Sequence, residues 1–253
     1  LNLRQFDKPS PEDAFNSEKD LQLYANSFFL NQTAAYDIVR GDAMSDYLVG
    51  RTISNYLYGS FGATQATGWS WSNLRKINYF LEHAPQANIT DEAKEHYLGL
   101  ARFFRAWFYF DMVKKFGDVP WYEKTLATDD PDLYKARDPR TLVMDSVLAD
   151  LDFACSHIRD TKDNSASQVT RWVALAFKSR VCLFEGTFRK YHTQLGLAGT
   201  ANGWLDAAAD AADKVMKGNK YQLLTSGSPE QNYRSLFNNE TPNSTEVMLA
   251  AVN

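Results

Sequence analysis

The chain has 253 residues, which is long enough to bury a sizeable core as one large domain or two smaller ones. Hydrophobic residues make up 44% and charged residues 23%, which excludes a disordered chain, and no run approaches the roughly 18 apolar residues that a membrane-spanning helix needs. The formal net charge of -4 argues against a nucleic-acid partner, because binding to phosphates needs clustered lysine and arginine.

The first helix is predicted at residues 18 to 31. Ser17 and Asp20 have the spacing of a capping box at its start. The apolar residues that follow recur at helical spacing: Leu21, Tyr24, Ala25, Phe28 and Phe29.

Residues 36 to 70 are predicted to form a long irregular loop. They are rich in glycine, serine, threonine, asparagine, aspartate and tyrosine, and they have no sustained periodicity. Loops of this length are uncommon in compact domains and tend to carry function.

A second helix is expected to begin near Trp71 and to end before Pro85. A third is expected at residues 91 to 116, with Thr90 as its N-cap and Gly117 just beyond its end. The third helix contains FFRAWFYF and is apolar on more than one face, so we expect its rings to be core and to be surrounded by other helices. Arg102 and Arg105 are then expected at the edge of the packed layer.

Three further helices follow. Asp138 is predicted to cap one that runs to about His157, and Thr170 one from Trp172 to about Phe188. The last begins at Trp204 and ends at Gly218, with alanines that permit close approach of a neighbouring helix. The fold class predicted from this pattern is all-α, with a loose tetratricopeptide-like helical repeat at residues 71–218.

The final residues, EVMLAAVN, are typical of a short β-strand, which would add minor β structure at this end. They stop without a turn or a partner strand. The chain opens at Leu1 without a charged segment followed by an apolar one, so any targeting peptide is expected upstream of these residues. We therefore interpret residues 1–253 as the N-terminal part of one larger domain whose C-terminal half is absent.

Motifs of catalysis, cofactor binding and metal binding are not found, so no catalytic residue, cofactor or metal ligand is predicted. The four histidines are dispersed, and Cys155 and Cys182 lie in apolar helical patterns typical of core thiols. Asp129, Asp130 and Asp132 have oxygen ligands that suit calcium, although a solvated acidic loop is the more common state of such a cluster.

The loop at residues 40–71 interleaves aromatic and short polar side chains. Aromatic faces stack on the C–H faces of sugar rings, while polar side chains bond sugar hydroxyls, so this mixture suits a carbohydrate site. The candidate ligand-binding residues are Trp69, Tyr56, Tyr58, Asn55, Asp46, Arg51 and Trp71. Alternatively, these rings anchor the loop to the helices below it, and the helical register favours that role for Trp71.

The stretch EHYLGLARFFRAWFYFDMVKKFGDVPW closely resembles the pattern of the SusD/RagB family. WSWSNLRKIN, VMDSVLADLDFA and TRWVALAFKSRVCLFEG resemble three further helices of that family, in the same order. YRSLFNNETPNSTEVMLA resembles its strand entry, so the likeness runs from about residue 10 to the end of the chain.

The resemblance implies a surface-exposed lipoprotein of the outer membrane, held by a lipidated cysteine upstream of this chain. It implies a non-catalytic protein that captures an oligosaccharide or polysaccharide and delivers it to a SusC-type TonB-dependent transporter. The glycan site would be built from loops on the face away from the transporter. Because the loop at residues 40–71 varies most within the family, no binding residue is transferred by motif.

Two other functions are compatible with an all-α chain rich in aromatic and acidic residues. One is a glycoside hydrolase of the α/α-toroid type, which needs two carboxylates at the scissile bond. The other is a peptide-binding helical-repeat adaptor that uses the concave face of the stack. Product release would identify the first, and exposed polar residues on the inner helix faces would favour the second.

Overall fold

The computed structural model describes residues 15–31, 57, 59–62 and 64–250, and nearly all of the regular structure in these residues is helical. The α-helices are α2 (Glu18–Asn26), α4 (Ser72–His83), α5 (Asp91–Phe116), α6 (Arg140–His157), α7 (Arg171–Tyr191), α8 (Ala201–Lys217) and α9 (Pro229–Asn238). Short 3₁₀ turns are η1 (Ser27–Asn31), η3 (Ala84–Gln86), η4 (Pro131–Tyr134), η5 (Thr193–Leu195) and η6 (Ala198–Thr200). The predicted all-α class is confirmed.

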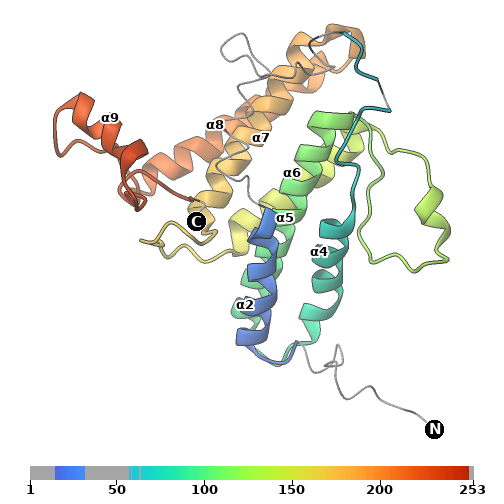
Figure 1. Ribbon diagram of the computed structural model, residues 1–253, viewed down its shortest axis with the longest axis horizontal. Coiled ribbons are helices and arrows are strands. Elements are labelled where there is room, and N and C mark those ends of the chain that lie inside the picture. Colours follow the sequence, from blue (N-terminus) through green and yellow to red (C-terminus); the bar gives the residue numbers. More distant parts are fainter. Residues whose placement is uncertain (1–14, 32–56, 58, 63, 251–253) are drawn as a thin grey trace.

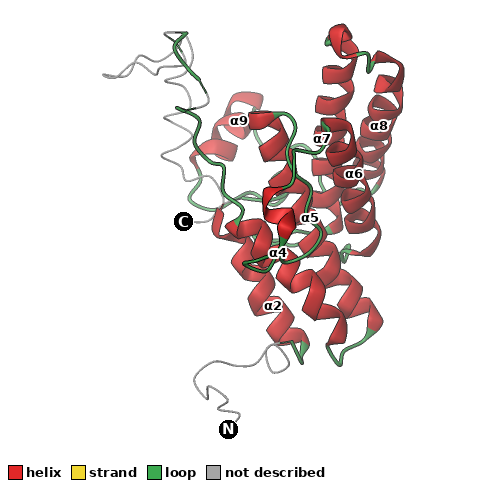
Figure 2. Cartoon of the chain, turned by 90° about the vertical axis from the view of Figure 1, so that its right-hand side faces the viewer, coloured by secondary structure: helices red, strands yellow, loops and turns green. Residues whose placement is uncertain are grey.

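From α4 to α8, helices that follow one another in the chain lie side by side in a stack (Figure 1). Helix α5 packs against α2, α4 and α6, and α7 packs against α6 and α8. Figure 2 shows the same order of helices from the side. This arrangement matches the predicted tetratricopeptide-like repeat, in which each helix contacts its neighbours in sequence.

The local signals at the helix ends work as predicted for α2 and α5. Ser17 and Asp20 form the capping box of α2, which continues as η1 to residue 31. The Thr90 side chain accepts a hydrogen bond from the Ala93 N–H, and α5 ends at Gly117, whose φ of 70° is a conformation that glycine adopts without strain.

Helix α5 is the centre of the core. Its rings at Phe103, Tyr109 and Phe110 are at most 3% exposed, as expected for a helix with apolar residues on several faces. Trp107 and Phe108 differ, because both are only half-buried and line a cavity. The interpretation of these rings as core is therefore confirmed for most of them, and two also reach an open surface.

Arg105 lies deeper than predicted. It is 7% exposed and makes two hydrogen bonds to Asp150 of α6, from Nε at 2.6 Å and from Nη2 at 2.8 Å. Arg102 is the arginine that stays at the edge, with its guanidinium 4.1 Å from the centre of the Phe153 ring. The difference arises because Asp150 supplies a buried counter-charge that the local pattern around α5 does not reveal.

A second buried ion pair ties α6 to α7. Arg140 donates to Glu185 at 2.6 Å from Nη2, and Arg189 donates to the other oxygen of Glu185 at 2.8 Å. Glu185 is fully buried, and the two arginines together satisfy both of its carboxylate oxygens.

The predicted cap of α6 is wrong, because another residue supplies the accepting carboxylate. Pro139, not Asp138, is the N-cap residue, and the first helical N–H, that of Arg140, donates to Asp118 at 2.8 Å. Asp138 instead accepts from the Trp121 N–H at 2.7 Å and pairs with Lys135 at 2.8 Å. The carboxylate of Asp118, in the loop after α5, therefore accepts the bond that was predicted for Asp138.

The close approach predicted for the alanine-rich helix α8 is present. Ala208 and Ala211 are buried, and the Ser179 hydroxyl of α7 donates to the Ala208 carbonyl at 2.8 Å. A Cβ placed on Gly186 would lie 2.7 Å from Leu205, so only glycine fits at this contact. The two cysteines are buried as predicted, and burial raises the pKa of Cys155 to about 11 and of Cys182 to about 12.

The C-terminal part differs from the prediction. Residues 229–238 form helix α9, which begins with Ser228 as N-cap and Pro229 in its first turn, a signal that the sequence contains. No strand is assigned within the described part of the final apolar run, residues 246–250. The Ala250 N–H instead donates to the carbonyl of Ala166, in the loop between α6 and α7. No β-strand lies beside it among the described residues.

Within the described ranges, no helix is long and apolar enough to cross a bilayer.

Candidate functional site

The structure describes only two of the seven predicted site residues. Trp69 and Trp71 lie in the segment that leads into α4, whereas Asp46, Arg51, Asn55, Tyr56 and Tyr58 lie outside the described residues. The site is therefore built here from Trp69, Trp71 and the elements that surround them.

The segment at residues 68–71 lies between two cavities. Gly68 and Ser70 line one cavity, and Trp69 and Trp71 line the other. The chain turns sharply here, because Gly68 has a φ of 90° and the Ser70 N–H donates to the Gly68 carbonyl at 2.9 Å. We name the two spaces the Trp107 cavity and the Trp69 cleft.

The Trp69 cleft lies between the N-terminal half of α4 and the loop that joins α5 to α6, residues 117–139, which extends beside α4 in Figure 1. Its volume is about 580 Å³, within the usual range of ligand pockets. Three aromatic rings line it, those of Trp69, Trp71 and Tyr122.

Trp69 remains 44% exposed although it contacts several neighbours. Its ring is edge-to-face with Trp71 at 5.2 Å and with Phe116 at 5.0 Å, and the Arg137 guanidinium lies 4.9 Å from its centre. These contacts hold the indole in place at the entrance of the cleft while much of its surface stays accessible.

Trp71 is the more deeply packed of the two tryptophans. It is the N-cap residue of α4, and its ring lies 5.7 Å from Phe108 and 5.4 Å from Tyr122. Its helical register indicated this packing role, and the same ring also forms part of the cleft wall.

Asn78 contributes a buried polar group that the sequence did not single out. The side chain is 1% exposed, and its Nδ2 donates to the carbonyls of Tyr122 at 3.0 Å and Lys124 at 3.2 Å. Its Oδ1 accepts no hydrogen bond from the described residues. A buried acceptor in a cleft wall favours a ligand that brings a hydroxyl or N–H donor.

Hydrogen bonds from the core hold the loop wall in position. The Tyr109 hydroxyl accepts from the Tyr122 N–H at 2.6 Å and donates to the Pro120 carbonyl at 3.3 Å. The Tyr122 hydroxyl in turn donates to the Asp132 carbonyl at 2.9 Å. Burial raises the pKa of Tyr109, so this hydroxyl keeps its proton.

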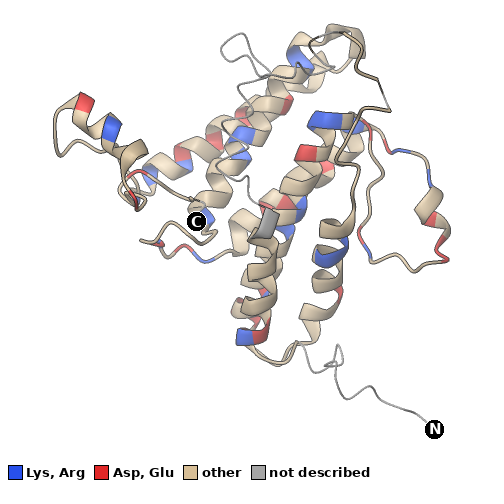
Figure 3. Cartoon of the chain, in the orientation of Figure 1, with Lys and Arg blue, Asp and Glu red and all other residues tan. Residues whose placement is uncertain are grey.

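Four basic side chains line the cleft: Arg75, Lys124, Lys135 and Arg137. Lys124 lies 3.1 Å from Asp130 and 3.5 Å from Asp132, and the hydrogen bond to Asp130 raises the pKa of Lys124. Figure 3 shows both signs of charge along this loop. Two members of the predicted acidic cluster, Asp130 and Asp132, thus pair with a lysine. No group of three metal-ligating side chains suited to a metal ion occurs among the described residues.

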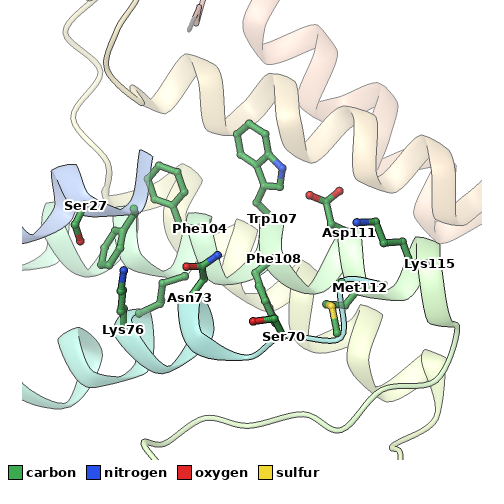
Figure 4. A pocket seen from close by; sticks show the side chains of 13 residues that line it. Ser27, Ser70, Asn73, Lys76, Phe104, Trp107, Phe108, Asp111, Met112 and Lys115 are labelled. Atoms are coloured by element: carbon green, nitrogen blue, oxygen red, sulfur yellow. The ribbon is translucent and has the colours of Figure 1, made fainter. Parts of the chain in front are cut away.

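The Trp107 cavity, shown in Figure 4, is the smaller one, with a volume of about 210 Å³. Helix α5 contributes Trp107, Phe108 and Asp111 to it, and α4 contributes Asn73 and Lys76. Trp107 also stacks on Phe177 of α7 at 5.0 Å, so this ring is half core and half cavity wall.

The histidines take structural positions in the described part of the chain. His83 and His157 bond the carbonyl four residues earlier, at 2.7 and 2.8 Å. His96 accepts from the Arg159 N–H at 3.2 Å, and burial lowers its pKa to about 4, so it is neutral at pH 7.

Comparisons with known proteins all lead to one group. A family profile described as starch-binding and associating with the outer membrane, the SusD-like profile, matches residues 18–183. A SusD-like protein of Formosa agariphila, named P38, is 26% identical over 183 residues, which are 72% of this chain and 31% of that protein.

Two solved structures from Bacteroides fragilis share the fold. One, a SusD-like protein, has a TM-score of 0.77 at 21% identity and covers 98% of this chain and 47% of its own. The other, a SusD-like carbohydrate-binding protein, has a TM-score of 0.66 at 18% identity. The match covers 83% of this chain and 42% of that protein. The chain thus spans less than half the length of each of these three relatives.

Proposed function

Because the chain belongs to the SusD-like family, we propose that the protein is a non-catalytic cell-surface receptor for oligosaccharides, with the Trp69 cleft as part of its binding site. It captures glycans at the outer membrane and delivers them to a SusC-type TonB-dependent transporter. The geometry of the cleft supports the binding site. The family supports the location at the outer membrane and the transporter partner.

The observation that carries the proposal is the exposed indole of Trp69 beside a buried acceptor. An aromatic ring that is 44% exposed and fixed by its neighbours offers an apolar face to a sugar ring. Asn78 of α4 lines the same cleft, and its Oδ1 has no partner among the described residues, so we propose this atom as the acceptor for a sugar hydroxyl. Stacking and hydroxyl recognition together are what carbohydrate binding requires.

Binding is favoured over hydrolysis by the position of the carboxylates. A glycosidase needs two of them on opposite sides of the bond. None of the described residues that line the Trp69 cleft is a carboxylate, and the nearby Asp130 and Asp138 are held by Lys124 and Lys135.

A peptide-binding role on the inner helix faces is less supported. The faces of α5 that meet α4 and α6 are filled by packed apolar residues and by the Arg105–Asp150 pair, which leaves few exposed polar groups there.

Affinity electrophoresis of the protein at its full natural length, across a panel of plant, host and microbial polysaccharides, tests the binding proposal. Retardation without product release is expected for at least one glycan. Trp69→Ala should then weaken retardation about fivefold or more, since one aromatic contact contributes about 1 kcal/mol.

Tyr134→Ala is the matched control. Tyr134 lies on the loop between α5 and α6, which forms the opposite wall of the cleft, and it is 89% exposed. It lines neither cavity, so its loss should leave retardation unchanged. Release of shorter sugars would overturn the non-catalytic assignment, and equal effects of the two substitutions would remove the Trp69 cleft from the site.

The transporter partner has its own test. A tagged, full-length protein should co-purify with a TonB-dependent transporter from outer membranes of its natural host after gentle detergent extraction. Recovery of the tagged protein alone, under conditions that preserve known transporter complexes, would argue against delivery to such a partner.

A further inference from the structure

The charges in the Trp69 cleft point to a substrate class, and we infer that this cleft selects saccharides that carry an anionic group, a uronate carboxylate or a sulfate ester. This inference rests on the proposed binding function and adds a chemical preference to it.

All the charged side chains among the described residues that line the cleft are basic. Arg75, Lys124, Lys135 and Arg137 line it, and none of the other described lining residues is acidic. The protein as a whole has a net charge of -4, so a general attraction of polyanions is not expected. An anion preference would have to arise from this local concentration of positive charge.

Two of the four cations are already neutralised. Lys124 pairs with Asp130 and Asp132, and Lys135 pairs with Asp138 at 2.8 Å. Lys135 also donates to the Trp121 carbonyl at 2.6 Å. These lysines hold the loop together and have little charge left for a ligand.

The two arginines are different. Arg75 donates from Nη1 to the Leu126 carbonyl, and Arg137 donates from Nη1 to the Phe116 carbonyl at 3.5 Å. Both acceptors are uncharged, and neither arginine has an ion pair with the described residues. Each guanidinium carries five N–H donors, so most of them remain for a bound group.

The positions of the arginines match the rest of the cleft. Arg137 lies against the Trp69 ring at 4.9 Å, so a sugar stacked beside that ring would bring a substituent near the guanidinium. Arg75 and Asn78 are three residues apart on α4, which places them on one face of the helix. A ring, an acceptor and two anion-binding groups thus converge on one space.

Arginine suits both anionic groups. Its planar donors bond carboxylate and sulfate oxygens in pairs, and such charge-assisted bonds are stronger than bonds between neutral groups. The two sources share this chemistry and differ in the number of acceptor oxygens, so experiment must separate them.

The test compares matched glycans on the protein at its full natural length. One arm pairs methyl-esterified with de-esterified homogalacturonan, and the other pairs dextran with dextran sulfate. We expect the anionic member of at least one arm to bind about tenfold more tightly at low salt, the effect of one charge-assisted hydrogen bond, and to weaken as salt is added. The arm that responds identifies the group.

Variants assign the preference to the cleft. Arg75→Gln with Arg137→Gln should abolish the anionic preference, and Arg75→Lys with Arg137→Lys should restore part of it, because charge returns without the paired donors. Arg180→Gln removes an exposed arginine of α7 that lines neither cavity, so it should leave the preference unchanged.

Two results would overturn the inference while the proposed function stands: equal or better binding of the neutral member in every pair, or an anionic preference that survives in the double glutamine variant. Failure to bind any glycan, neutral or anionic, would overturn both.

Discussion

Arginines of the helical stack and arginines of the Trp69 cleft have opposite surroundings. Arg105, Arg140 and Arg189 are at most 9% exposed and bond buried carboxylates. Arg75 and Arg137 are exposed and donate only to carbonyl oxygens among the described residues. The stack uses its arginines to join helices, and the cleft leaves their charge available.

Aromatic rings divide in the same way. Phe103 and Tyr109 of α5 are completely buried, whereas Trp69 is 44% exposed at the entrance of the cleft. A residue type therefore does not reveal its role. The role depends on whether neighbouring elements cover the side chain or leave it open.

The largest expected effect concerns the buried ion pair of the stack. Asp150→Ala leaves the Arg105 guanidinium buried without a counter-charge, so the free energy of unfolding should fall by about 3–5 kcal/mol. Urea unfolding at pH 7 measures this change.

Asp111→Ala is the matched control on α5, because its pair with Lys114 is exposed and should contribute little. Adding Arg105→Met to Asp150→Ala should recover most of the lost stability. A double variant as unstable as the single one would mean that the helix contact, and not the unpaired charge, is responsible.

A smaller effect is expected from pH within the stack. His96 has a pKa lowered to about 4 by burial, so the unfolded chain takes up a proton near pH 6.5 that the folded chain does not bind. Stability should therefore fall as the pH decreases from 6.5 to about 4, by roughly 1–2 kcal/mol for a partly exposed ring.

His96→Gln should reduce this pH dependence, whereas His192→Gln at the exposed end of α7 should not. Urea unfolding of the three proteins between pH 7 and about 4 measures how the free energy of unfolding depends on pH. An unchanged slope in His96→Gln would assign the loss of stability to the carboxylates instead.

The smallest effect on stability is expected in the cleft. Trp69→Ala should lower the free energy of unfolding by about 1 kcal/mol or less, because much of its ring is exposed in the folded state. Phe103→Ala in the stack should lower it by about 3–5 kcal/mol. Similar losses in thermal or urea unfolding would contradict the distinction between the two regions.

The helices were predictable because their signals are local. Thr90 and Gly117 mark the two ends of α5 as observed, and the capping box of α2 lies within four residues. Even so, the sequence predicted Asp138 as the cap of α6. In the structure the Arg140 N–H donates to Asp118, which lies 22 residues earlier in the chain. Capping preferences consider only residues next to the helix end, so they could not predict a carboxylate from that distance.

The candidate site was predictable only in part. Trp69 and Trp71 stood out as aromatic residues in a loop. Asn78 did not, because its sequence neighbours do not reveal that its Oδ1 is buried without a partner among the described residues. Arg75 and Arg137 were not singled out, because nothing in the sequence says that they line one space.

Residue order alone established the all-α class, the ends of most helices and the family likeness, since periodicity and capping depend on neighbours within a few residues. The cleft depends on contacts between distant residues: Asn78 bonds Tyr122 across 44 positions, and Arg75 bonds Leu126 across 51. Folding of the loop against α4 creates the space and determines which charges face it, because burial and electrostatic pairing are properties of the packed chain.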